Sequence, residues 1–464
     1  MTECAGVLLD AGHEVVQVLT DAPKVRDWAM GRSIACTASD AALEEVDFLF
    51  AVTHLSLLSE TTLSAPKIAA INFHDGPLPE WTGLNTPVWG LLDGVTRWGI
   101  RWHLMTADVD AGDVVAARDF DVARHETALS LNTKNFVAGL EAFRELVPML
   151  ADGSWRGTAQ PEGERKRFKR KDRPEHGGFL DFGRSAEALA QQVRALTFGP
   201  YANPVSAPKV LLSDQVLLVE SAEAAPEDTG ATPGSVLDAT PRIACREGTI
   251  RLGGLRTLDG TPVEAIEAGV VLPALPSDDW SARLGRHEAY WVERIRAFEA
   301  PDLGIEQEPT GRRTRLALRL PRELHAAELE AAFIAFLGRR SGGQTVDVVV
   351  PARWDGPAAL RICVAPWVPL RLDTPPTWTR ADAEASVSKA KHQTTKRATY
   401  LLDLLVRDPV LRPPAATVGL AEGQAAGGPG VLLDAGDAAL LVDEAWLRAG
   451  EDLRRRFELF LTRW

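Results

Sequence analysis

Apolar and polar positions over residues 1–150 follow two different periods. Runs rich in apolar and β-branched residues predict short strands at 14–19, 46–52, 68–73 and 98–105. Helical spacing of apolar residues covers 4–11, where Gly12 ends the pattern, and again 131–150, which Gly153 follows. Strands that alternate with helices and are apolar on both faces predict an α/β fold with a parallel sheet between helices.

The pattern changes after residue 160. A basic run at 165–171 precedes proline and glycine residues, so we expect an exposed linker there. A helix at 185–196 and the short strands after it predict a small β-domain. These strands are expected at 210–212, 216–219 and 249–252. A further helix at 288–298 leads into the last segment.

The last segment mixes helices and strands. Helices are predicted at 324–337 and 447–462, strands at 346–350 and 360–364, and a glycine- and alanine-rich loop at 425–430. We therefore expect four regions along the chain. They are 1–160, 161–265, 266–300 and 301–464.

Composition narrows the class of protein. The chain has 464 residues, a formal net charge of -13 and four cysteines that lie far apart. The acidic balance argues against a general nucleic-acid binder, whose surface is basic. The cysteine spacing predicts neither a disulfide framework nor a metal site, which fits a reducing cytoplasm. No apolar run reaches the roughly 20 residues of a membrane span and no signal-peptide charge pattern opens the chain, so we expect a cytoplasmic protein.

Polar residues gather after two of the predicted strands. Asn72 and His74 are two residues apart at the end of the strand at 68–73, so they point to one face. The carboxyl ends of such strands are where open α/β sheets bind ligands. Asp108 and Asp110 follow the next strand, and we expect their carboxylates to reach the same rim.

This set of side chains suits the attack of an amine on a carbonyl carbon. An Asn amide and a protonated His can donate to the developing oxyanion, while a carboxylate orients the His and either group takes the amine proton. No Ser or Cys lies in a nucleophile elbow and no glycine-rich phosphate loop is present, so neither an acyl-enzyme nor nucleotide use is indicated. From spacing alone, a turn cap at Asn72 and a turn residue at Asp110 explain the same pattern, and both interpretations stay open.

One combination of motifs resembles the formyltransferases that use 10-formyltetrahydrofolate. The motifs are Asn72-x-His74, Pro77-Leu78-Pro79, Trp81-x-Gly83 and Asp110-x-Gly112-Asp113. The resemblance covers about the first 260 residues and implies a Rossmann-like catalytic domain followed by a small OB-like β-domain. It also implies that Asn72, His74 and Asp110 are catalytic, with a formyl- or formimino-tetrahydrofolate as co-substrate and no metal.

The resemblance further assigns residues to the two substrates. The residues expected to hold the folate are Leu57, Leu58, Thr106, Asp108 and Val109. The residues expected to face the amine are Asp75, Trp81 and Asn85. Many members have a small polar residue or proline where this sequence has Asp75, and an acidic group there favours a cationic amine.

One departure from the family concerns the first strand. The family opens with a strand and a loop before its first helix, whereas this sequence begins almost at the helix. We expect another segment to take the place of that strand, or the chain to start further upstream.

Other details resemble formyltransferase domains of nonribosomal peptide synthetases, among them Trp28-Ala29, Trp102-His103 and Asn203-Pro204. The segment at 301–464 resembles part of a condensation (chloramphenicol-acetyltransferase-like) fold, in particular at Pro369-Leu370-Arg371. The active motif of that fold has two adjacent histidines, and this sequence has no His-His pair. We therefore expect a degenerate α/β half-domain. It is a structural or dimerising appendage, a docking element or a small-molecule site.

The resemblance thus implies a one-carbon transferase of specialised metabolism. It moves a formyl or formimino (iminomethyl) group to a primary amine of a peptide-like or aminoglycoside-like antibiotic, or of an aminoacyl group on a carrier protein. We expect no nucleic-acid or membrane partner, and homodimerisation stays open. The alternatives are a non-catalytic docking module of a nonribosomal peptide pathway and an amino-sugar N-formyltransferase.

Overall fold

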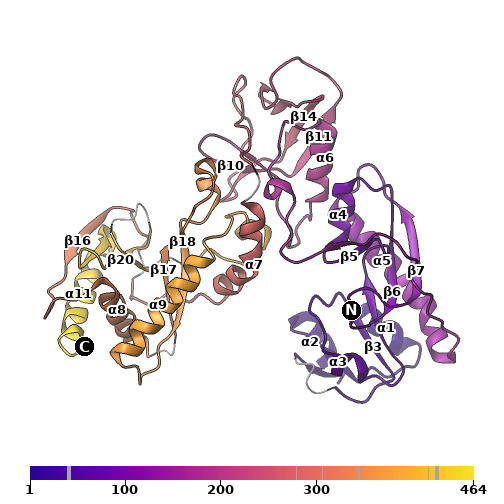
Figure 1. Ribbon diagram of the computed structural model, residues 1–464, viewed down its shortest axis with the longest axis horizontal. Helices are drawn as coiled ribbons and strands as arrows, with labels where there is room; N and C mark the ends of the chain where they lie inside the picture. Colours follow the sequence, from indigo (N-terminus) through magenta and orange to yellow (C-terminus); the bar gives the residue numbers. More distant parts are fainter. Residues whose placement is uncertain (39–42, 278–279, 306, 343–344, 416, 424–427) are drawn as a thin grey trace.

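The computed structural model describes residues 1–38, 43–277, 280–305, 307–342, 345–415, 417–423 and 428–464. The glycine- and alanine-rich loop expected at 425–430 lies partly outside these residues. An N-terminal α/β region and a C-terminal α/β region occupy opposite ends of the molecule, and a small β region lies between them (Figure 1).

The N-terminal region is built on a mixed sheet in the order β3-β4-β6-β7. Its strands are β3 (Phe48–Val52), β4 (Ala69–His74), β6 (Arg97–Leu104) and β7 (Val114–Asp121). β3 and β4 are parallel, and the α/β class is confirmed. The strand predicted at 98–105, however, runs antiparallel to β4. The reason is that the connection between them does not cross back over the sheet, so β6 begins at the end where β4 stops.

Helix α5 (Ala128–Asp152) covers one face of this sheet. A capping box between Thr127 and Ser130 starts the helix. Its close approach depends on Gly139, because a Cβ there would lie 2.4 Å from the ring of Phe73. The indole of Trp102 donates to the Gly139 carbonyl at 3.0 Å, which fixes the helix against β6.

The first residues lie beside the main sheet, and Cys4 packs into the core that the sheet shares with α5. Their elements are α1 (Thr2–Asp10), β1 (Gln17–Leu19), α2 (Pro23–Met30) and β2 (Ala35–Thr37). Among the residues that the structure describes, β1 pairs only with β2, in a two-stranded parallel sheet. The expectation that the strand at 14–19 joins the main sheet is therefore wrong: its three paired residues meet β2, and Val18 packs in a small core with Ala29 and Ile34.

The connection between β4 and β6 carries two short elements that frame the candidate site. They are β5 (Trp81–Gly83) and α4 (Thr86–Asp93), while α3 (Glu60–Ser64) precedes β4. Part of the basic run expected to be an exposed linker is instead β8 (Lys166–Phe168), which pairs in parallel with β5. Lys166 makes this pairing favourable because its ammonium group lies 2.7 Å from an oxygen of Asp93 and 4.5 Å from the ring centroid of Trp81.

The small β region contains a three-stranded sheet, β15-β10-β9, and a four-stranded sheet, β11-β14-β13-β12. The strands are β9 (Lys209–Leu211), β10 (Val216–Leu218), β11 (Ser221–Ala225), β12 (Val236–Asp238), β13 (Arg242–Ala244), β14 (Thr249–Gly253) and β15 (Arg256–Thr257). Helix α6 (Ala186–Ala195) buries its apolar face against them in one core. A short 3-10 helix, η1 (Glu175–Gly178), precedes this region.

The C-terminal region has a six-stranded sheet in the order β16-β21-β20-β19-β17-β18. The strands are β16 (Arg313–Ala317), β17 (Thr345–Pro351), β18 (Trp367–Asp373), β19 (Val418–Ala421), β20 (Val431–Asp434) and β21 (Ala439–Asp443). The helices are α7 (Ser281–Arg296), α8 (Ala326–Ser341), α9 (Arg380–Lys396), α10 (Leu404–Arg407) and α11 (Leu447–Leu461), with a 3-10 turn η3 (Glu444–Trp446). Residues of α7, α8, α9 and α11 share one apolar core with the sheet.

One strand prediction in this region is wrong. Residues 360–364 lie mostly in a 3-10 helix, η2 (Ala358–Cys363), that begins after Pro357. The apolar residues Leu360, Cys363 and Val364 are buried, but they pack against Trp280 and Leu401 in a separate core. An apolar run of this length does not distinguish a buried turn from a buried strand.

Buried charges join the small β region to the C-terminal region. The ammonium group of Lys209 lies 2.6 Å from an oxygen of Asp403, and both side chains are almost fully buried. Lys209 also donates to the Gly177 carbonyl at 2.6 Å. Arg407 donates to the Asn203 carbonyl at 2.9 Å and pairs with Glu288 of α7. Each charge is therefore compensated by a group from another segment.

We expect Asp403→Ala to destabilise the protein by about 3–5 kcal/mol, because it leaves the ammonium group of Lys209 buried without its counter-ion. Urea unfolding followed by fluorescence measures this loss. The control is Asp437→Ala, which removes an exposed partner of Arg315 and changes stability by less than about 1 kcal/mol. Equal effects of the two substitutions would contradict the interpretation.

The same pair predicts a pH dependence. Burial alone raises the pKa of Asp403, but the charges of Lys209 and Arg407 outweigh it and lower that pKa to about 2. A carboxylate with a lowered pKa contributes stability above about pH 4, and this contribution is lost as the pH falls towards about 2. Stability measured from pH 5 to pH 2 should therefore fall more steeply in the wild type than in Asp403→Asn.

Candidate active site

Asn72 and His74 lie on β4 and share one face of the sheet. His74 is 4% exposed, and its Nε2 lies 2.7 Å from the carbonyl oxygen of Trp81. Because a carbonyl accepts only, this contact places a hydrogen on Nε2. The other ring nitrogen, Nδ1, faces Asp110 at 3.8 Å, an ion-pair distance rather than a hydrogen bond.

Asp110 reaches this face from the loop that joins β6 to β7. The sequence pattern predicts that the strand before Asp110 ends at the same rim as β4. Since β6 runs antiparallel to β4, β6 in fact ends beside Ile71. The loop instead turns back over the sheet, with Asp110 in the left-handed region at φ 56°. Gly112 allows this turn, since a Cβ there would lie 2.0 Å from the carbonyl oxygen of Leu104.

The carboxylate of Asp110 lies beside one backbone N–H and two imidazole rings. Its Oδ2 accepts the backbone N–H of Gly83 at 2.8 Å, and its Oδ1 lies 3.5 Å from Nε2 of His103. Burial raises the pKa of this carboxyl, but the contacts with His103, His74 and Gly83 outweigh burial and lower it. Asp110 therefore stays ionised in a site where it is 9% exposed.

His103 completes the cluster and was not predicted. Its Nδ1 lies 2.8 Å from the carbonyl oxygen of Leu104, and its Nε2 lies 3.1 Å from the amide nitrogen of Asn72. Asn72 and His103 are register partners of β4 and β6. Sequence reasoning missed His103 because that register is set by tertiary pairing.

Gln160 was also missed. Its side-chain nitrogen donates to the carbonyl oxygens of Asp110 and Gly112 at 2.9 and 2.8 Å. These two bonds hold the loop in its folded-back position. The residue follows α5 by several positions and carries no motif, so no sequence signal marks it.

The ring of Trp81 packs in the core, while the backbone of its strand lines the cluster. The ring is 2% exposed and packs against Trp98 and Phe168. The backbone of β5 reaches the cluster at two points: the Trp81 carbonyl contacts His74, and the Gly83 N–H contacts Asp110. Gly83 has φ 91°, and a Cβ there would lie 2.0 Å from the carbonyl oxygen of Phe168, so only glycine fits beside β8.

The other two residues expected to face the amine differ in their surroundings. Asp75 accepts a hydrogen bond from the Thr86 hydroxyl at 2.9 Å, and burial raises its pKa. Its carboxyl thus braces the turn before α4, and burial makes its ionised form less favourable than in water. Asn85 is partly exposed, precedes α4 at φ 57° and uses no side-chain bond to cap that helix.

The residues expected to hold the folate form two exposed segments. Leu57 is 83% exposed, and its neighbour Leu58 is partly buried. In the other segment, the Thr106 hydroxyl donates to the Asp108 carbonyl at 2.9 Å, which shapes the loop that leads through Val109 to Asp110. Their role in binding folate stays a prediction.

Comparison with known families identifies this part of the chain. Residues 11–146 match the family model described as formyl transferase, and the matched stretch contains Asn72, His74, His103 and Asp110. This stretch is a formyl transferase domain. The resemblance seen in the sequence is therefore confirmed for the N-terminal region, and the match does not extend to the condensation-like segment.

Solved structures similar to the chain include several formyltransferases. An N-formyltransferase from Helicobacter canadensis, in complex with folinic acid and dTDP-3-aminofucose, is 16% identical with a TM-score of 0.45, over 54% of this chain and 94% of that chain. The sugar 3N-formyl transferase WlaRD is also 16% identical with a TM-score of 0.45, over 57% of this chain and 94% of that chain. HypX from Aquifex aeolicus, in complex with tetrahydrofolic acid, is 19% identical with a TM-score of 0.41, over 55% of this chain and 42% of that chain.

Within the described part of the chain, no helix is both long enough and apolar enough to cross a membrane.

The contacts of the formyl transferase domain predict opposite tautomers for its two buried histidines. In their neutral forms, His74 should carry its hydrogen on Nε2, facing the Trp81 carbonyl, and His103 on Nδ1, facing the Leu104 carbonyl. Nitrogen-15 chemical shifts of labelled histidine measure this, with His74→Ala and His103→Ala used for assignment. The same tautomer at both positions would contradict the geometry.

Proposed function

We propose that this chain is a folate-dependent N-formyltransferase of specialised metabolism. It transfers a formyl group, or its formimino analogue, from 10-formyltetrahydrofolate or a formimino-tetrahydrofolate to a primary amine. The observation that carries the proposal is the buried cluster of Asn72, His74, His103 and Asp110 on the face of the β4–β6 pair.

Each member of the cluster has a role that its contacts support. The amide nitrogen of Asn72 carries two hydrogens, and its bond to His103 uses one, so the other is available to the oxyanion. His74 bonds to Trp81 through Nε2, so its Nδ1 is the position that gains or gives a proton beside Asp110. Asp110 remains a carboxylate and stabilises the protonated imidazole.

These groups account for every bond and proton that changes in the transfer. The amine nitrogen forms a bond to the one-carbon unit, and the bond between that carbon and its carrier nitrogen breaks. The proton lost by the amine passes through His74, which Asp110 stabilises in its protonated form, and ends on the carrier nitrogen. No covalent intermediate with the chain is needed.

The described residues fit a folate. Leu55 and Leu57 are 61% and 83% exposed, and such apolar side chains suit the flat face of a heterocycle. The folate would supply the activated one-carbon unit, while Leu57, Leu58, Thr106, Asp108 and Val109 would hold it beside Asp110.

Three acceptor classes follow from the sequence. They are a peptide-like or aminoglycoside-like antibiotic, an aminoacyl group on a carrier protein, and an amino sugar. The raised pKa of Asp75 weakens the argument for selection of a strongly cationic amine. The acceptor panel therefore includes all three classes.

We expect the purified protein to add a formyl or iminomethyl group to at least one amine of this panel. His74→Ala and Asp110→Ala should each lower the rate by about a hundredfold or more, the scale of a general acid–base group. Mass spectrometry of mixtures that contain either folate donor gives the reaction class and the acceptor class together.

His125→Ala is the matched control, because His125 is an exposed histidine of the same domain. Full activity of His74→Ala would contradict the proposal. Loss of activity with unchanged folate binding would place His74 in the chemical step. No product and no folate binding would favour the non-catalytic docking module instead.

A further inference from the structure

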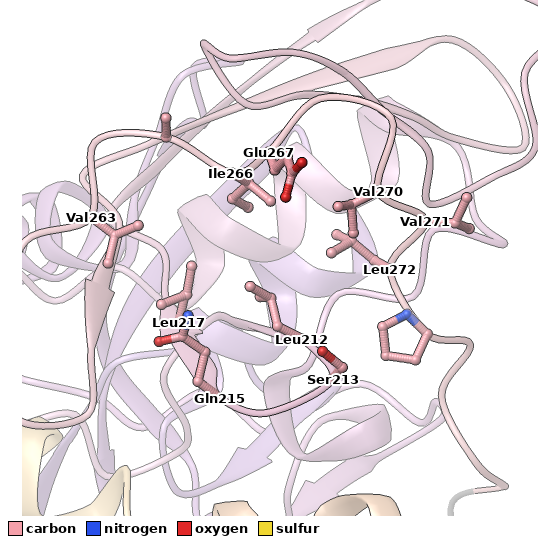
Figure 2. A pocket seen from close by; sticks show the side chains of 12 residues that line it. Leu212, Ser213, Gln215, Leu217, Val263, Ile266, Glu267, Val270, Val271 and Leu272 are labelled. Carbon is pink, nitrogen blue, oxygen red and sulfur yellow. The ribbon is translucent and has the colours of Figure 1, made fainter.

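A cavity of about 370 Å³ lies in the small β region, and its lining residues come from 212–217 and 263–273. The first set belongs to the β9–β10 hairpin, and the second is an irregular strap that follows β15. Figure 2 shows Leu212 and Leu217 on one side of the cavity, with Ile266, Val270 and Leu272 opposite. Such a volume lies in the range of about 300–1,000 Å³ that is typical of small-molecule sites.

Both ends of the strap are tied to the neighbouring strands. The N–H of Val263 donates to Leu255 at 2.9 Å, and the N–H of Leu272 donates to Gly234 at 2.9 Å. Between them, Ile266 is 4% exposed and belongs to the core of this region. The cavity wall is thus part of the folded domain.

The lining of the cavity includes one charged side chain, and that side chain is acidic. Of the residues that line it, Glu267 alone is charged, and Ser213 and Gln215 add a hydroxyl and a carboxamide. In Figure 2 the carboxylate of Glu267 lies between Ile266 and Val270, and Ser213 and Gln215 lie at the opposite, lower edge of the cavity. An apolar space with one carboxylate on its wall is complementary to a hydrocarbon body that carries an ammonium group.

We propose that this cavity binds a small amphipathic amine, whose hydrocarbon body lies between Leu212, Leu217 and Leu272 and whose ammonium group pairs with Glu267. The site is separate from the Asn72–His74–Asp110 cluster, and it does not depend on the proposed transfer reaction.

Straight-chain amines test the apolar part. Calorimetry with butylamine, hexylamine and octylamine should show binding that tightens about threefold to fourfold per methylene until the cavity is full. Leucine and valine methyl groups labelled with carbon-13 should report hexylamine at Leu212, Leu217 and Leu272. Absence of saturable binding at millimolar octylamine, or shifts confined to other methyl groups, would overturn the proposal.

Charge is tested with hexylamine, hexanol and hexanoate. We expect Glu267→Gln to weaken hexylamine about threefold to fivefold and to leave hexanol unchanged. Glu264→Gln is the control, because Glu264 lies exposed in the same strap and does not line the cavity. Hexanoate binding as tight as hexylamine, or equal effects of the two Gln variants, would overturn the assignment of an amine.

Occupation of the cavity is tested with Val270→Trp, at a residue that lines it and is 38% exposed. The added ring should abolish binding of hexylamine and hexanol alike. Leu459→Trp, at an exposed residue of α11, should leave both unchanged. Unchanged binding in Val270→Trp would place the ligand elsewhere and overturn the proposal.

Discussion

The burial of one carboxylate, that of Asp110, constrains the layout of the formyl transferase domain. An ionised carboxyl that is 9% exposed is tolerated only with donors or positive charge around it, because an unpaired buried charge costs several kcal/mol. Its neighbours come from three elements: His74 from β4, Gly83 from β5 and His103 from β6. These contacts therefore stabilise the packing of the three elements against one another. The cluster that we propose as catalytic thus also contributes to the fold.

Close backbone contacts bring these elements to the carboxylate of Asp110. The hairpin turns back over the sheet only because Gly112 passes close to the Leu104 carbonyl, and Gln160 then holds the turn. On the other side, Gly83 packs against the carbonyl of Phe168 in β8, which brings its N–H to Asp110. The glycines of the Trp-x-Gly and Asp-x-Gly motifs are thus explained by close backbone contacts.

The sequence predicted what local pattern and motif can specify. The strand that carries Asn72 and His74, helix α5 and the formyl transferase assignment were all correct, because each is marked by residues close together in the chain. The misses share a non-local cause. The position of His103 in the cluster depends on the register of β4 with β6. The strand β8 forms because it pairs with β5, and the contacting residues Thr82 and Lys166 are 84 positions apart in the chain. Trp81 shows that a motif residue can contact the site through its backbone while its side chain fills the core, which a sequence pattern does not reveal.

The same electrostatic argument applies to the C-terminal region. Lys209 of the small β region is buried because Asp403 compensates it, and Arg407 is compensated by Glu288 of α7. Burial lowers the pKa of Lys209, so its ammonium form depends on the acidic partner. A segment without the paired histidines of a condensation centre therefore still has a physical role, since it supplies the counter-charges of its neighbour. Removing the C-terminal region would expose apolar surface and would leave Lys209 buried without the carboxylate of Asp403. Truncation would therefore destabilise the small β region as well. Substitutions on the surface of the C-terminal region are the better way to test whether that region affects amine transfer.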